Sequence, residues 1–339
     1  MLRLKYILQE GFQRLRIFGV RKTLLKIVFS FLNYYLQRKL NRIVIKGIAE
    51  RKLDTQCLGL NINASLFLNP FDKGFSKEFY LFGFREPLLT KVLSIIVKRL
   101  KTVVIDIGSN LGYYPLIELQ SGAQYVIAIE PIPLTFTLLN RSLEKYKNKC
   151  KLLHAAISNQ EGKVKLMIPS AWNQARILTK TTTNANMLVE VKALTLKSIL
   201  SKFNFDKTLY LIRMDVEGYE YEILKDLPKQ VNIIALELHV SPRSGLTKTL
   251  AIKLINNLSR QGYKMVTFIK PLPKPFYFIV RKFSLETARK LAEMFNIAVI
   301  IPVTTTTNVI EFIKKDKDAD YYNTIYHLVF YKHTSNLER

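Results

Sequence analysis

Four acidic residues lie at or just after short apolar runs of the kind that form buried parallel strands. Asp106 lies near the end of the first run, Glu130 follows the second, Asp215 follows the fourth, and Glu237 lies near the end of the fifth. The carboxyl ends of parallel strands meet at one edge of a sheet, where open α/β sheets bind ligands. His239 comes two residues after Glu237, so both side chains project from one face if the strand continues. The sequence therefore predicts that these side chains surround one crevice.

The residues after Asp106 predict a tight turn between a strand and a helix. Residues 103–114 read VVIDIGSNLGYY, in which Gly108 and Gly112 allow a sharp turn or the close approach of a ligand. Asn110 is the type of residue that most readily replaces glycine in the left-handed conformation. A dinucleotide site would read G-x-G-x-x-G, whereas this turn reads D-x-G-x-N-x-G. The turn thus indicates a nucleotide-like ligand other than a dinucleotide.

The two acids near this turn suit S-adenosylmethionine (SAM). An acid two residues before the first glycine matches the ammonium of the amino-acid part of SAM, which lies next to the sulfonium. Glu130 lies about twenty residues after the turn, where a ribose-binding carboxylate belongs. Asp106 by itself could equally be a helix-capping or solvated acid, but its spacing from Glu130 favours a cofactor site.

Five blocks of the sequence resemble the FkbM-type SAM-dependent methyltransferases. They read VVIDIGSNLGYYP, IAIEPIP, HAAISNQEG, LIRMDVEGYEYEIL and ALELH, and the resemblance runs from about residue 79 to about residue 239. It implies a class I methyltransferase with SAM as cofactor and a sugar, polyketide or other secondary metabolite as acceptor. Arg213 departs from the lysine usual in the family, but it keeps the charge and is expected to lose little. The predicted cofactor-binding residues are Asp106, Gly108, Asn110, Gly112, Tyr113, Glu130, Pro131 and Ala156.

The predicted catalytic residues are Asp215, His239 and Glu237. Methyl transfer to a hydroxyl needs alignment of the reactants and removal of the hydroxyl proton. Asp215 and His239 are the candidates to steer and deprotonate the acceptor, since histidine has a near-neutral pKa. His239 could also be a hydrogen-bonded loop residue, whereas Glu86 and Glu217 are interpreted as acids that complement helix N-termini.

A metal ion is a second interpretation of the same crevice. Asp215, Glu237 and His239 could together hold one divalent cation, because carboxylates suit hard metals. This has less support than direct acid–base chemistry, and the four histidines show no metal-ligand spacing along the chain. No metal ligand is therefore assigned.

The order of apolar runs predicts an α/β fold with a Rossmann-like, doubly wound, mostly parallel seven-stranded sheet. Residues 1–50 are expected to form a basic amphipathic helical extension, and 51–100 an accessory segment with a lead-in helix from Pro87. Residues 101–333 are expected to form the methyltransferase domain, with an insertion at about 271–323. Its strands are predicted at 103–107, 124–129, 151–157, 208–214, 232–238, 262–269 and, antiparallel, 326–332.

The composition bounds the partners. The 339 residues include 52 Lys and Arg against 26 Asp and Glu, a net charge of +26, which favours a nucleic acid, a membrane surface, or an acidic glycan or lipid. Only Cys57 and Cys150 are present, which excludes a disulfide framework and a cysteine-based zinc site and favours a reducing, cytoplasmic setting. No N/D-P-P-Y/F block follows the fourth strand, so a nucleic acid acceptor is less favoured.

The N-terminal residues predict an amphipathic helix. Apolar residues at 25, 28, 32, 36, 40 and 43 recur opposite a polar stripe at 22, 26, 30, 33, 37 and 41. No run is long enough to span a membrane, and no signal peptide is indicated. Residues 1–46 could dock peripherally on an anionic membrane, or the same face could pack on protein.

These observations predict an SAM-dependent methyltransferase that methylates a hydroxyl of a small-molecule, glycan or lipid-linked acceptor. Two alternatives remain at this point. One is a methyltransferase of RNA or another nucleic acid, which the charge would suit. The other is a non-catalytic adaptor at a membrane surface that keeps the fold.

Overall fold

The computed structural model describes residues 20–169, 175–177, 187–203, 205, 208–240, 246–294, 299–302, 305–316 and 324–332, with the backbone alone for 20–29, 176, 294 and 299–302. The sequence also predicts a loop at 170–187 over the crevice, and this segment lies largely outside the described residues. Residues 1–19 of the N-terminal extension lie outside them as well.

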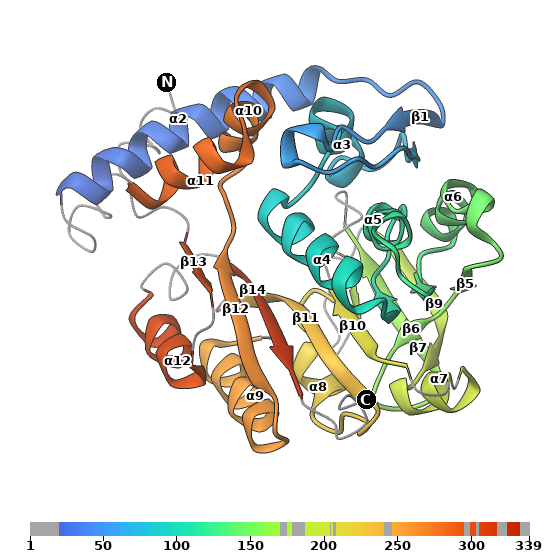
Figure 1. Ribbon diagram of the computed structural model, residues 1–339. Helices are drawn as coiled ribbons and strands as arrows, with labels where there is room; N and C mark the ends of the chain where they lie inside the picture. The colour runs from blue at the N-terminus through green and yellow to red at the C-terminus, as the bar shows by residue number, and fades with distance from the viewer. Residues whose placement is uncertain are drawn as a thin grey trace.

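An eight-stranded sheet in the order β13-β12-β14-β11-β10-β3-β4-β5 forms the centre of the molecule (Figure 1). Strands β5, β4, β3, β10 and β11 are parallel, whereas β14 is antiparallel to both β11 and β12. This is the predicted Rossmann-like, mostly parallel fold. Its strands are β3 (Val103–Ile107), β4 (Tyr125–Ile129), β5 (Cys150–Leu153), β10 (Tyr210–Met214), β11 (Val231–Val240), β12 (Lys264–Lys270), β13 (Val299–Pro302) and β14 (Thr324–Tyr331).

All seven predicted strands are present in this sheet. An eighth, β13, comes from the predicted insertion and pairs with the edge of the sheet through β12. The apolar run at 298–303 by itself predicts a strand, but periodicity does not say which sheet a strand joins. The predicted strand 151–157 also divides, because β5 ends at Leu153 and β6 (Ala156–Ile157) joins a second sheet.

Both faces of the central sheet are apolar, which is why helices cover both. Along β3, Ile105 packs with one apolar cluster and Val104 with the other, because successive side chains point to opposite faces. One face carries α4 (Pro87–Leu100), α5 (Tyr113–Ser121) and α6 (Pro133–Ser142). The other carries α7 (Leu196–Lys202), α8 (Glu220–Leu224), α9 (Lys248–Arg260) and α12 (Thr306–Lys315).

A second sheet, in the order β6-β9-β7-β8, lies beside the parallel strands. Its strands are β7 (Gly162–Ile168) and β9 (Met187–Leu194). Towards the C-terminal end of each strand, buried residues alternate with more exposed ones, which is the pattern of a strand with one face towards solvent. The remaining member is β8 (Arg176–Ile177), and a 3₁₀ turn, η2 (Glu144–Tyr146), precedes β5. This sheet supplies one wall of the larger cavity described below.

The N-terminal helix α2 (Val20–Arg42) packs on part of the insertion, α10 (Phe276–Lys282) and α11 (Leu285–Met294), which lie beside it in Figure 1. Leu36 and Leu40 enter the same apolar cluster as Phe82 and Tyr277, whose ring centroids lie 5.3 Å apart. The layer is completed by β1 (Ala49–Lys52), η1 (Gln56–Leu58), β2 (Ser65–Leu68) and α3 (Phe75–Phe82). The sequence of the insertion predicts a helix at 284–296, which corresponds to α11, but not the other two helices of its described residues, α10 and α12.

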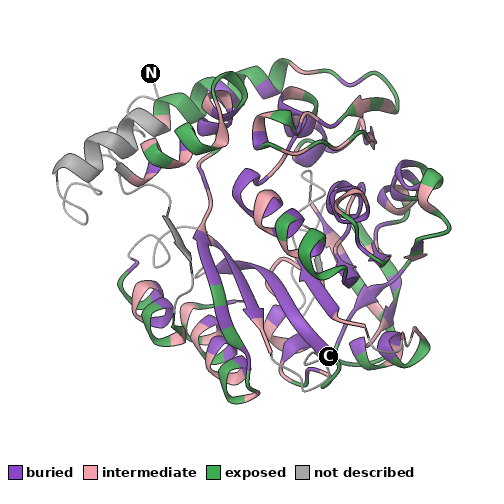
Figure 2. Cartoon of the chain, viewed as in Figure 1, coloured by how far each residue is buried: buried purple, intermediate pink, exposed green. Residues whose placement is uncertain are grey.

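The predicted two-sided pattern of this helix is not confirmed. Leu36 and Leu40 are buried, but Leu32, from the same predicted apolar face, is 45% exposed beside Phe31 and Tyr35, which are also exposed. Figure 2 shows much of the described part of α2 in the colour of exposed residues. Packing on protein therefore explains why Leu36 and Leu40, towards the C-terminal end of α2, are apolar. Among the described residues, no helix combines the length and apolar character needed to cross a membrane.

The packing of α3 against the insertion predicts a large cost for truncating Phe82. Phe82→Ala should lower the free energy of unfolding by about 3–5 kcal/mol, because it removes a fully buried ring and leaves a cavity between α3 and α10. Phe71→Ala, at a ring that is 67% exposed, is the control and should change it by less than about 0.5 kcal/mol. Urea unfolding measures both, and equal small losses would contradict the described packing.

Candidate active site

The turn after β3 has the predicted conformation. Gly108 and Asn110 both have positive φ, 78° and 51°. A Cβ on Gly108 would lie 2.1 Å from the carbonyl oxygen of Asp215, so only glycine fits between the two strand ends. The amide groups of Gly108 and Ser109 donate to the carbonyl oxygen of Ile129 over 3.0 Å each. These bonds fix the turn across the carboxyl ends of β3, β4 and β10.

The larger of two cavities described at this edge lies over the turn. Five of the predicted cofactor residues line it: Gly108, Asn110, Glu130, Pro131 and Ala156. Asp215 and Glu217 also line it, and most of its remaining wall is apolar, from Ile107, Ile129, Ile132, Ala155, Ile157, Leu166, Ala175, Ile177 and Val216. The cavity is therefore mainly apolar, with carboxylates in its wall.

Glu130 is fixed in the wall by two backbone amides. Its Oε2 accepts from the amide of Asn110 and its Oε1 from the amide of Ile132, each over 2.9 Å. Burial raises the pKa of Glu130 to about 7 despite these bonds. A fixed carboxylate with remaining lone pairs suits the two hydroxyls of a ribose, and the apolar wall suits an adenine. The residues present thus fit SAM.

The smaller cavity shares Gly108, Asn110 and Asp215 with the larger one and is more polar. Tyr113, a predicted cofactor residue, lines it, and its hydroxyl lies 3.2 Å from the carbonyl oxygen of Arg85. Its other lining residues are Phe75, Arg85, Ser109, Tyr114 and Arg213. Sequence reasoning gave no role in the site to Phe75, Arg85 or Tyr114, because the segment before Pro87 shows only the start of a helix.

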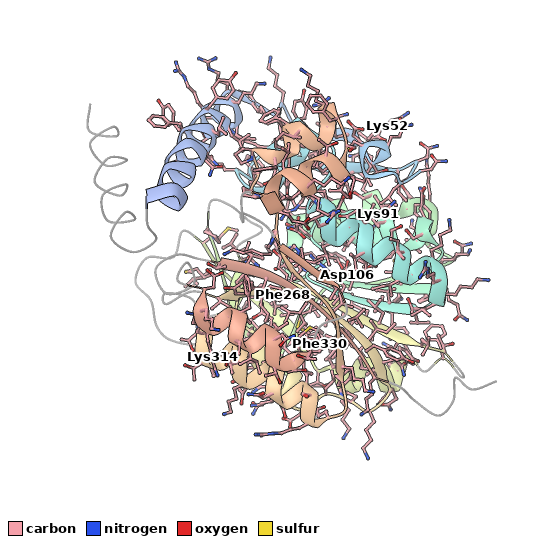
Figure 3. The ribbon with its side chains drawn as sticks, turned by 60° about the vertical axis from the view of Figure 1, so that its left-hand side comes forward. Lys52, Lys91, Asp106, Phe268, Lys314 and Phe330 are labelled. Carbon is pink, nitrogen blue, oxygen red and sulfur yellow. The ribbon has the colours of Figure 1, made fainter. Side chains whose placement is uncertain are left out.

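Two predicted cofactor residues are not among those that line these cavities. Asp106 is fully buried in the middle of the molecule (Figure 3). Its Oδ1 accepts from Nη1 of Arg213 over 3.3 Å, and burial raises the pKa of Asp106 to about 6. Gly112 precedes α5 with φ 100°, and a Cβ there would lie 3.0 Å from Leu139. The structure thus places both residues beneath the turn, where they shape it.

The three predicted catalytic residues do come together, around the imidazole of His239. Its Nε2 lies 3.3 Å from Oδ1 of Asp215 and 3.3 Å from Oε1 of Glu237. Its Nδ1 lies 3.4 Å from Oε2 of Glu217, which was interpreted only as a helix-terminus acid. Glu217 has a φ of 53°, a conformation that sequence alone does not show and that directs it towards the site.

The charges around His239 do not suit a neutral base. Burial by itself would lower the pKa of His239, but the carboxylates of Glu217, Asp215 and Glu237 raise that pKa well above its ordinary value. Burial raises the pKa of Glu217 to about 8. The neighbouring carboxylates therefore favour the protonated form of His239.

A second buried group adjoins the first and shares Glu237. His327 on β14 is the cross-strand partner of Glu237 on β11, and its Nε2 lies 3.8 Å from Oε2 of Glu237 and 3.9 Å from Oε2 of Glu86. Glu86 was interpreted as a helix-start acid, but its carboxylate points inward and accepts from Arg85 and from the hydroxyl of Tyr114. His239 and His327 are far apart in sequence, so spacing along the chain could not reveal this neighbourhood.

Comparison with known proteins identifies the central part of the chain. Residues 106–265 match the family model described as the methyltransferase FkbM domain. This segment is similar to methyltransferase FkbM domains. The match begins at Asp106 and ends in β12. It therefore includes the turn after β3 and the candidate catalytic residues Asp215, Glu237 and His239. The family confirms the sequence resemblance and implies SAM as the cofactor.

Other comparisons add little to this FkbM assignment. No curated protein matches the chain significantly. A Pyrococcus horikoshii protein assigned as a transferase aligns at 12% identity and TM-score 0.40, over 84% of this chain and 72% of its own. A precorrin-6y C5,15-methyltransferase from Geobacter metallireducens GS-15 aligns at 11% and 0.34, over 74% and 90%. A ribosomal protein L11 methylase from Lactobacillus delbrueckii subsp. bulgaricus aligns at 14% and 0.30, over 54% and 72%. With all three TM-scores below 0.5, the assignment rests on the family match.

The position of Glu130 predicts how cofactor affinity depends on pH. Ribose hydroxyls donate to a charged carboxylate, whereas a protonated Glu130 loses part of this interaction. Because the pKa of Glu130 is raised to about 7, affinity for S-adenosylhomocysteine should be highest above pH 7 and should fall as the pH decreases through 7. Glu130→Gln should weaken binding about tenfold or more at pH 8 and remove this pH dependence.

Titration calorimetry from pH 5.5 to 8.5 measures this effect, with Glu144→Gln, at an exposed acid, as the control. Equal affinity and an equal pH profile in Glu130→Gln and in the unmodified protein would show that Glu130 does not bind the ribose.

Proposed function

We propose that this methyltransferase transfers the methyl group of SAM to a hydroxyl of a sugar, glycan, lipid-linked or secondary-metabolite acceptor. The observation that carries the proposal is the place of Asp215, which lines both the larger, mainly apolar cavity and the smaller, polar one. A carboxylate at this junction contacts both the methyl donor's site and the space next to it. Bound SAM supplies a methyl group on a sulfonium, and the protein must supply alignment and a route for the proton.

The smaller cavity suits an acceptor with oxygen atoms and a partly apolar face. Arg85 and Arg213 offer hydrogen-bond donors, and each is held against a ring, Arg85 at 4.6 Å from the centroid of Phe75 and Arg213 at 4.1 Å from that of Tyr114. Aromatic faces beside fixed donors match the alternating apolar and polar faces of a sugar ring. This supports a hydroxyl acceptor of the kind that the family resemblance implies.

Asp215 is the residue that we assign to the acceptor hydroxyl. Nη2 of Arg213 lies 3.5 Å from its Oδ2, and His239 faces its Oδ1 at 3.3 Å, so the carboxylate is held from two sides. Burial by itself would raise the pKa of Asp215, but the adjacent His239 and the charge of Arg213 lower it, which keeps Asp215 charged at neutral pH. A charged and positioned carboxylate can accept the hydroxyl proton as the methyl group is transferred.

The proposal predicts that Asp215→Asn lowers turnover by about 100-fold or more and leaves binding of S-adenosylhomocysteine within a few-fold. The substitution keeps the shape but removes the charge that accepts the proton. Asp226→Asn, at an exposed acid after α8, is the control and should retain full turnover. The assay uses radiolabelled SAM with fractionated cell extract, because the extract offers acceptors of every class.

The fraction that takes up label decides between acceptor classes. Label in glycan, lipid or small-molecule fractions supports the proposal. Label in RNA or DNA would support the nucleic acid alternative, which the net charge of +26 favours. Bound SAM with no label transferred to any fraction would favour a non-catalytic adaptor.

We further propose that the N-terminal layer docks on an anionic membrane, which would bring the smaller cavity to a lipid-linked acceptor. The exposed side of α2 carries Phe31, Leu32 and Tyr35 next to Arg38, Lys39 and Arg42. Exposed rings insert into the headgroup region, and each nearby cation contributes about 1 kcal/mol at an anionic surface. Charge complementarity therefore favours an anionic lipid surface over a protein partner.

The full chain should co-sediment with vesicles that contain anionic lipid but only weakly with neutral ones. Replacing Phe31 and Tyr35 with Gln should weaken this binding about tenfold, because it removes apolar contact without disturbing the buried Leu36 and Leu40. Leu188→Gln, at an exposed residue of β9, is the control. If the full chain stays in the supernatant with anionic vesicles at low salt, the membrane proposal is wrong.

A further inference from the structure

We propose that Asp215, Glu217 and His239 form a binding site for one divalent cation at the junction of the two cavities, and that this ion binds oxygen atoms of the acceptor. The inference rests on the proposed function and deepens it. It assigns a metal to a group of side chains whose individual roles in acid–base chemistry do not explain their arrangement.

The distances between the side chains suit a common ion. One donor atom from each of the three residues lies within 4.8 Å of the others. Two ligands of one cation, each at about 2.0–2.6 Å from it, can lie no more than about 4–5 Å apart. The set offers two carboxylates and one imidazole, which is a donor set for Mg²⁺, Mn²⁺ or Fe²⁺ and not for a thiolate-bound metal.

Three acidic side chains crowd one imidazole in this group. Asp215, Glu217 and Glu237 all approach His239 within 3.4 Å, so one imidazole faces three carboxylates. Arg213 is the other nearby cation, but it also pairs with the buried Asp106. A divalent cation would supply the missing positive charge and would let His239 bind as a neutral ligand.

Buried oxygen atoms without hydrogen bonds are a second, independent observation. Glu237 is only 3% exposed, and its Oε2 accepts no hydrogen bond from the described residues. Oδ1 of Asp215 is likewise buried and accepts none from them. An unsatisfied buried carboxylate oxygen is costly, and a cation with its bound waters satisfies such atoms at once. Glu237 would then not bind the ion itself but would hold His239, one of the three ligands, in position.

Access from solvent distinguishes this group of three ligands from the neighbouring group around His327. The side chains of Asp215 and Glu217 are 19% and 15% exposed and line the larger cavity, so an ion can enter and keep open positions. Glu86, Glu237 and His327 also lie within reach of one ion, but all three are buried. Both oxygens of Glu86 already accept hydrogen bonds, from Arg85 and Tyr114. A cation there would have to displace these partners.

The open positions of the ion would face the space that Asp215 shares with the smaller cavity. A cation in this place binds a hydroxyl oxygen and lowers its pKa, which favours loss of the proton near neutral pH. Two open positions select an acceptor with two neighbouring oxygen atoms, such as a vicinal diol of a sugar. The site therefore restricts the acceptor class beyond a single hydroxyl.

Binding of MnCl₂ to the full chain tests the site without any acceptor. Electron paramagnetic resonance should count one Mn²⁺ per chain, displaced by excess Mg²⁺. Glu217→Gln should weaken binding at least tenfold, whereas Glu222→Gln, whose carboxylate pairs with Lys225, should bind as the unmodified chain does. Circular dichroism and retained binding of S-adenosylhomocysteine confirm that the variants are folded.

Several outcomes would overturn the inference. Absence of Mn²⁺ binding by the unmodified chain would do so, as would equal binding by Glu217→Gln. Binding that survives Glu217→Gln but is lost in His327→Gln would place the ion in the neighbouring group. Methyl transfer that persists in EDTA, without Mn²⁺ binding, would leave the proposed function intact. Mn²⁺ binding without methyl transfer to any fraction would reject the proposed function and leave the metal site.

Discussion

The guanidinium of Arg213 is the interaction on which the rest of the site depends. It is buried at the end of β10, where its Nη1 donates to Asp106 and to the carbonyl oxygen of Gly108, and its Nη2 faces Asp215 and Glu237. Leaving any of these buried carboxylates without a counter-charge would cost several kcal/mol. The view that arginine merely keeps the charge of the family's usual lysine is therefore incomplete. A lysine has one point charge and no planar fork, so it could not serve two sets of partners or stack on Tyr114 in the same way.

The parallel sheet explains why such distant residues meet at this cation. Strands β3, β10 and β11 are neighbours and end at the same edge, so Asp106, Asp215 and Glu237 come together without any contact being specified by local sequence. The antiparallel β14 then lies directly against β11 and brings His327 opposite Glu237. Gly108 completes the arrangement, because the carbonyl of Asp215 occupies the space of its absent Cβ. The fold thus holds a concentration of buried charge that no single segment could hold.

The sequence predicts those features of the fold that depend on residues close together along the chain. The strand–turn–helix at Asp106 and the order of the parallel strands are written in short patterns of apolar residues and glycines, and these were predicted. The position of Glu86, the inward turn of Glu217 and the neighbourhood of His327 depend on backbone conformations and strand pairings between distant segments. Periodicity carries no information on these. The helices α10 and α12, which pack on α3 and α9, were also not predicted.

The overall charge and the charge of the site have opposite signs, and they act on different partners. The excess of 52 Lys and Arg over 26 Asp and Glu must lie mainly at the surface, where it can attract an anionic acceptor or membrane over about a Debye length. Within the crevice, Glu130, Asp215, Glu217 and Glu237 converge, and burial raises the pKa of three of them, to about 7 for Glu130 and Glu237 and about 8 for Glu217. Net charge therefore says nothing of what the crevice binds. A cationic cofactor in the crevice would stabilise the charged form of these carboxylates, whereas the basic surface favours an anionic partner. One chain can meet both demands because burial separates the two groups of charges.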